Sequence, residues 1–121
     1  MAVNDIDTAL ALASFDRDEL LKAIDGDMEL FNEIIGVFRE EASGLVSAMG
    51  AAIANGDAEG VETTAHALKG SSLTISALKI ARLAHILESM GRDRDLDAAE
   101  KVFACVKAGL TELEKIFGAE S

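Results

Sequence analysis

The chain has 121 residues, a formal net charge of −11, and a composition in which half of the residues are apolar. This length suits one domain with a buried core, and the acidity excludes anionic partners such as nucleic acid and membranes. The single cysteine, Cys105, excludes an internal disulfide and a cysteine-based zinc cluster, and we interpret it as a packing residue.

The composition also predicts the type of secondary structure and the cellular location. Proline, tryptophan and tyrosine are missing, while alanine, leucine and glutamate are plentiful, which favours helices over strands. Residues 1–6 are acidic rather than basic, unlike a signal peptide, and no apolar run reaches the length of a membrane span. We therefore expect a cytoplasmic protein.

In the first half of the chain the pattern predicts one short and one long helix. We expect residues 1–14 to form an N-terminal segment that is partly ordered. The stretch FDRDELLKAI predicts a short helix, because Asp16 can cap it and acidic residues occupy its first turn. Residues 28–54 predict a long helix, with apolar side chains at helical spacing from Phe31 to Ile53. Three glycines inside it each cost roughly 1 kcal/mol relative to alanine, which packing must outweigh.

The second half of the chain predicts three more helices with short connections. Asp57, at the end of the turn sequence NGD, is the expected N-cap of the first. A break near Ser76 and the stretch GRDRDLD separate the others, and the expected helices span residues 58–75, 77–90 and about 96–117. Since short connections make successive helices antiparallel, we expect an all-α, antiparallel four-helix bundle with an additional short N-terminal helix, in one domain spanning residues 1–121.

His66 is predicted to face solvent from the helix over residues 58–75. One side of that helix is a stripe of small and apolar residues, and His66 lies roughly 140° from its centre at about 100° per residue. The stripe consists of Val61, Ala65, Leu68, Ser72 and Ile75. A histidine without any role is the alternative interpretation.

The neighbours of His66 favour a role as a phosphoryl carrier. Lys69 and Gly70 lie one turn further along the same side of the helix. Lys69 places a cation beside the imidazole, and Gly70, a poor helix residue, leaves the ring accessible. A neutral imidazole is a good nucleophile near neutral pH, and the cation can offset the charge of an attached phosphoryl group.

Lys69 by itself does not make the chain a catalyst of phosphoryl transfer. An exposed ion pair contributes about 0.2–1 kcal/mol, whereas enzymes lower barriers by about 8 kcal/mol or more. A partner must therefore supply the metal ion and most of the transition-state stabilisation.

These residues resemble a known family. The stretch AHALKGSS, followed by ALKIARLAHILESMGR, is similar to the histidine-containing phosphotransfer (HPt) domain of bacterial two-component phosphorelays. The resemblance extends from DRDELL through the last helix. It implies that His66 is the phospho-acceptor, that Lys69 stabilises the charge of the phosphoryl group, and that Gly70 gives a partner access.

The resemblance also implies the partners. His66 would accept the phosphoryl group from the aspartate of a response-regulator receiver domain or a hybrid sensor histidine kinase, and pass it to another receiver. The receiver binds Mg²⁺, so the chain needs no cofactor or metal of its own, and it has no kinase activity. We expect a monomer, with Glu62, Ala67 and Leu73 in contact with the partner.

Two positions depart from the family pattern. Leu73 replaces a residue that is usually small, on the His66 side of the helix, and would enlarge an apolar docking patch or narrow the choice of receivers. Ser76 stands where the family often has a glycine, which affects the turn between two helices rather than the site.

A second resemblance concerns His85 and Glu88, in LAHILE, which are similar to a histidine and a glutamate of the phosphotransfer domain of chemotaxis histidine kinases. There the glutamate hydrogen-bonds the reactive imidazole. This likeness implies that Glu88 orients His66 and fixes its tautomer. The alternative is that Glu88 is a solvated acidic residue.

Other candidates are weaker. His85 as the acceptor is disfavoured because Glu88 lies at i+3 and would repel a phosphoryl group, and a metal site from His66 and His85 lacks further ligands. We interpret Arg82 and the acidic residues of 93–97 as solvated. Two alternative functions stay open: a phospho-acceptor domain of a larger kinase of the chemotaxis or hybrid type, and a non-catalytic helical adaptor.

Overall fold

Three of the helices begin at an aspartate whose side chain caps the first turn. Asp16, Asp27 and Asp57 each accept a hydrogen bond of 3.0 Å from the backbone N–H three residues later. The computed structural model describes residues 3–120. In that range it contains the helices α1 (Val3–Leu10), α2 (Arg17–Ala23), α3 (Met28–Ala54), α4 (Ala58–Thr74), α5 (Leu78–Arg92) and α6 (Ala99–Glu120).

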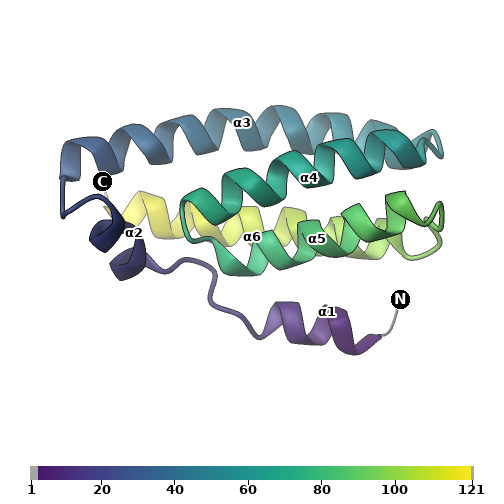
Figure 1. The fold of residues 1–121 in the computed structure, drawn as a ribbon, viewed down its shortest axis with the longest axis horizontal. Helices are drawn as coiled ribbons and strands as arrows, with labels where there is room; N and C mark the ends of the chain where they lie inside the picture. Colours follow the sequence, from purple (N-terminus) through teal and green to yellow (C-terminus); the bar gives the residue numbers. More distant parts are fainter. Residues whose placement is uncertain (1–2, 121) are drawn as a thin grey trace.

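The four long helices form the bundle (Figure 1). Helices α3 to α6 run antiparallel in succession, α1 lies along the outer side of α5, and α2 lies at the end of the bundle where α3 begins. The expected all-α, antiparallel four-helix bundle is confirmed. The observed helix ends differ from the expected ones by up to three residues, as the tight turns take residues 75–77 and the loop takes residues 93–98.

Helix α1 was not expected, so the prediction of five helices was wrong. Residues 3–10 are helical, and Ile6 and Ala9, three residues apart, are buried against the bundle. A helix of eight residues is marginal by itself in water, so its stability comes from packing on α5. Its four apolar residues, Val3, Ile6, Ala9 and Leu10, follow helical spacing, a signal that could have predicted α1 from the sequence.

The segment between α1 and α2 completes the start of α5. The N-cap residue of α5, Ala77, has no side chain that can accept a hydrogen bond. Instead, the carbonyl of Ala13 accepts a hydrogen bond of 3.0 Å from the N–H of Lys79, and the N–H of Asp16 donates to the carbonyl of Ser76 at 2.9 Å. The N-terminal segment therefore takes over the capping that α5 lacks.

Ser76 forms the turn between α4 and α5 with a left-handed backbone, φ 62°. Glycine adopts this conformation without steric cost, whereas a serine here carries the strain of a left-handed backbone. The N–H of Ser76 donates to the carbonyl of Leu73, and the N–H of Ala77 donates to that of Ser72. The turn thus keeps a helix-ending geometry despite the serine.

Aromatic side chains close the end of the bundle next to α2. The ring of Phe15 lies 6.2 Å from that of Phe31 and 5.3 Å from that of Phe117, measured between centroids. Phe38 and Phe117 are 6.4 Å apart in an edge-to-face arrangement. None of the helices in residues 3–120 has the length and apolarity to cross a membrane.

Candidate functional site

His66 projects from the exposed side of α4. The opposite side is packed into the bundle, and each residue of the predicted stripe is at most 1% exposed: Val61, Ala65, Leu68, Ser72 and Ile75. The side chain of His66 is 69% exposed. The predicted orientation of the helix is therefore correct.

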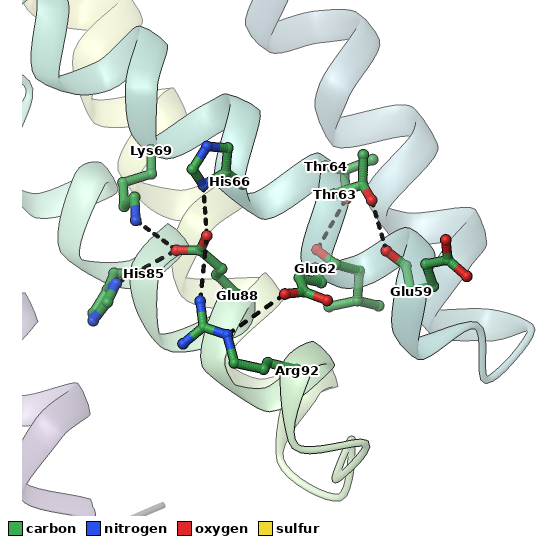
Figure 2. A network of polar contacts seen from close by, with 10 residues as sticks. Glu59, Glu62, Thr63, Thr64, His66, Lys69, His85, Glu88 and Arg92 are labelled. Atoms are coloured by element: carbon green, nitrogen blue, oxygen red, sulfur yellow. Dashed lines mark hydrogen bonds and ion pairs between the residues drawn. The ribbon is translucent and has the colours of Figure 1, made fainter.

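Glu88 reaches His66 from the neighbouring helix α5. Its side chain is only 5% exposed, and its Oε2 lies 2.6 Å from Nδ1 of His66 (Figure 2). The interpretation of Glu88 as a solvated acidic residue was wrong. The carboxylate is buried at the junction of α4 and α5 and turned toward the imidazole.

Lys69 contacts the second oxygen of the same carboxylate. Its Nζ donates to Oε1 of Glu88 at 2.6 Å, and its side chain is 25% exposed. Burial raises the pKa of Glu88, but the hydrogen bonds with Lys69 and His66 and the positive charges of these partners outweigh burial. The net effect lowers the pKa of Glu88 from 4.5 to about 2, so the carboxylate is ionised at neutral pH.

The ionised carboxylate determines the tautomer of His66. A carboxylate without a proton can only accept hydrogen bonds, so Nδ1 of His66 carries the proton that forms the contact with Glu88. The lone pair of the neutral ring is then on Nε2. In Figure 2 this nitrogen points away from Glu88, and the ring is mostly exposed.

Two further basic side chains surround Glu88. Nη2 of Arg92 lies 3.6 Å from Oε2 of Glu88, and Nε of Arg92 lies 3.5 Å from the carboxylate of Glu62. Nδ1 of His85 lies 3.5 Å from Oε1 of Glu88. Arg92 was not among the predicted site residues, although its spacing of four residues from Glu88 on a helix could have indicated the contact. His85 lies on the Lys69 side of the carboxylate rather than facing His66 (Figure 2).

The surface around His66 is open. A Cβ at Gly70 would meet no atom outside its own stretch of helix within 4 Å. Ala67 is exposed, and Leu73 is a large apolar residue with 55% exposure. Glu62 is partly exposed one turn before His66 and is paired with Arg92. The residues expected to meet a partner thus lie on the outer side of α4.

Gly91 allows the backbones of α4 and α5 to approach closely near this site. A Cβ at Gly91 would lie 2.6 Å from the backbone nitrogen of Glu62 and 2.7 Å from the carbonyl oxygen of Ala58. Gly91 directly precedes Arg92 and follows Glu88 by less than one turn. The close approach brings the end of α5 against the start of α4, which places Glu88 beside His66. From the sequence alone, Gly91 was interpreted only as part of the break between two helices.

In the part of the chain whose side chains are described, no three or more His, Cys, Asp or Glu residues are grouped so that they could hold a metal ion. The two histidines of the network both approach the same carboxylate, from its two oxygens.

This fold and site define a class of protein, an antiparallel helical bundle with an exposed histidine on the second of its four long helices. The family model of the Hpt domain matches residues 33–116, from within α3 to near the end of α6. The chain therefore belongs to the Hpt domain family, and its function is histidine phosphotransfer in a phosphorelay. Members of this family are phosphoryl carriers rather than kinases, and they interact with receiver domains and kinases.

Among solved structures, the chain is similar to histidine-containing phosphotransfer protein B (HptB) from Pseudomonas aeruginosa PAO1. The TM-score is 0.84 and the sequence identity 21%, over 91% of this chain and 96% of that chain. At this identity the similarity shows the fold. A search of curated proteins gives no match.

Proposed function

We propose that Nε2 of His66 accepts the phosphoryl group from the aspartyl phosphate of a receiver domain and passes it to the aspartate of another receiver. One observation carries this assignment. His66 is largely exposed while its Nδ1 is held by the buried carboxylate of Glu88, so that Nε2 is available to a partner.

The phosphoryl group moves from aspartate to His66 without either side chain gaining or losing a proton. The lone pair of Nε2 attacks phosphorus, a P–N bond forms, and the P–O bond to the aspartate breaks, so that the aspartate leaves as a carboxylate. The ring keeps its proton on Nδ1 and becomes cationic. Glu88 stabilises that cation through the contact of 2.6 Å. Return of the phosphoryl group to another aspartate reverses the same steps.

The residues around His66 have separate roles in this proposal. An ammonium group has three donors, and Lys69 uses one on Glu88, which leaves others for the phosphoryl oxygens. Gly70 leaves space above α4 for the receiver backbone. Glu62, Ala67 and Leu73 contact the receiver at the edges of the site.

The proposal assigns the remaining chemistry to the partner. The receiver supplies Mg²⁺, and this chain contributes no metal or other cofactor and no kinase activity of its own. It acts as a monomer in the cytoplasm, where receivers and hybrid sensor kinases exchange phosphoryl groups. The alternatives of a kinase domain or a helical adaptor without phosphoryl chemistry are not favoured by the family match.

Incubation with a phosphorylated receiver tests the assignment. We expect an acid-labile label on the wild-type chain, no label on His66→Gln, and a label that still forms on the matched variant His85→Gln. Mass spectrometry of the labelled peptide should place the phosphoryl group on His66. A label that persists in His66→Gln, or that is lost in His85→Gln alone, contradicts the proposal.

A further inference from the structure

A second surface feature lies beside the site, between α4, α5 and the segment that connects α1 to α2. It is a groove of about 430 Å³ whose apolar lining is Leu12, Leu73, Leu78 and Ala81. Lys69, Arg82 and His85 also line it, so it is continuous with the His66 site through Lys69. We refer to it as the α4/α5 groove.

The charge of this groove is opposite to that of the chain. The chain carries a net charge of −11, yet the exposed ionisable side chains of α5 are all basic, since its one carboxylate, Glu88, is buried. Lys79 pairs with Glu112, and Arg92 pairs with Glu62. Arg82 is exposed and makes no ion pair or hydrogen bond with any side chain described in residues 5–118.

The groove on the other side of α4 has charged residues of the opposite sign. It lies between α3 and α4, has a volume of about 570 Å³, and is lined by apolar side chains that include Ile34 and Val37. Its charged lining residues are Glu33 and Glu41, and no basic residue lines it. The ridge of α4 that carries His66 and Gly70 is therefore flanked by one cationic and one anionic groove.

We propose that the α4/α5 groove binds a segment of the receiver in which an apolar side chain lies next to a carboxylate, with Arg82 pairing the carboxylate. This inference rests on the proposed function and identifies how the partner is oriented. A receiver surface that binds Mg²⁺ beside an aspartate must be rich in carboxylates. Such a surface is attracted by Arg82 and Lys69 and repelled by Glu33 and Glu41, so one docking orientation is favoured.

Charge reversal at Arg82 tests the proposal. Arg82→Glu should slow phosphoryl exchange with a phosphorylated receiver by roughly tenfold at low salt, and added salt should reduce the difference. The matched control is Lys101→Glu, which makes the same change of charge at an exposed position of α6 that lines neither groove. It should exchange within about twofold of the wild type.

A small donor separates docking from the chemistry at His66. Phosphoramidate transfers its phosphoryl group to imidazole with release of ammonia and needs no protein surface. Arg82→Glu should be labelled by phosphoramidate at the wild-type rate. If that label is also slowed, Arg82 acts on the histidine and the docking proposal is overturned. The docking proposal is also overturned if Arg82→Glu exchanges phosphoryl groups with the receiver at the same rate as the wild type.

Opposite charges at Leu12 provide an independent test, because this residue lines the groove from outside the four-helix bundle. Leu12→Asp should exchange more slowly than Leu12→Lys with the same receiver at low salt. Equal rates contradict the proposal. If the wild type takes no phosphoryl group on His66 from either donor, the proposed function itself fails. If transfer is normal but does not respond to these charges, only the docking proposal fails.

Discussion

Glu88 is the residue on which the electrostatics of the site depend. A buried carboxylate without partners is strongly unfavourable, so its place at the junction of two helices requires compensation. Lys69 and His66 supply it from α4, each at 2.6 Å, and Arg92 approaches from the next turn of α5. One carboxylate thereby sets the tautomer of the reactive ring and holds the lysine beside it.

The lowered pKa of Glu88 predicts how stability responds to acid. Since the pKa is 4.5 before folding and about 2 in the fold, ionised Glu88 stabilises the chain above pH 4.5. That contribution, about 3 kcal/mol at 1.36 kcal/mol per unit, is lost as pH falls from 4.5 to 2. Urea unfolding at pH 7 and pH 2.5 should show a smaller loss of stability in Glu88→Gln than in the wild type. Identical losses contradict the contacts assigned to the carboxylate.

At the scale of elements, the geometry of the site depends on how closely α4 approaches α5. The helical glycines differ in whether they allow such a close approach. Gly91 lies against the backbone of α4, whereas Gly36 on α3 has open space where a Cβ would be. Helix packing therefore requires a glycine at position 91 but not at position 36. Gly50 is intermediate, because a Cβ there would lie 3.1 Å from the ring of Phe103.

A matched pair of alanine substitutions tests this difference. Gly91→Ala should lower the free energy of unfolding by about 1–3 kcal/mol, because backbone atoms of Glu62 and Ala58 must move away. Gly36→Ala should raise it by about 0.5–1 kcal/mol, as expected for an exposed helical site. Chemical denaturation measures both. A Gly91→Ala variant as stable as the wild type would mean that the two helices do not need this close approach.

At the scale of the whole molecule, the N-terminal segment stabilises the bundle from outside. Helix α1 packs on α5, the carbonyl of Ala13 caps the start of α5, and Phe15 joins the aromatic cluster at the end of the bundle. The segment thus contacts the helix that carries Glu88 at two places and also forms one wall of the α4/α5 groove.

Truncation of one side chain measures this contribution. Ile6 is 6% exposed, and Ile6→Ala should cost about 2 kcal/mol of stability, near the lower limit for a buried isoleucine, because α1 lies at the edge of the fold. Leu10 is 42% exposed on the same helix, and Leu10→Ala should change stability by less than about 0.5 kcal/mol. Thermal unfolding of both variants provides the comparison. Equal effects would show that α1 does not pack as described.

The sequence by itself determined the features that depend on neighbours along the chain. The capping aspartates, the apolar face of α4 and the exposed side of His66 follow from spacing within one or two helical turns, and the cluster of His66, Lys69 and Gly70 lies within a single turn. Such relations are fixed by the period of the helix and do not require knowledge of the packing.

Only the tertiary structure decided the relations between helices. Glu88 is 22 residues from His66 in sequence, and its burial and contact depend on how closely α4 and α5 approach at Gly91. The capping of α5 by Ala13, the docking of α1, and the opposite charges of the grooves likewise join distant segments. Helical periodicity predicts which side of its helix a residue faces. The distance and rotation between packed helices determine which side chains of the neighbouring helix that residue contacts.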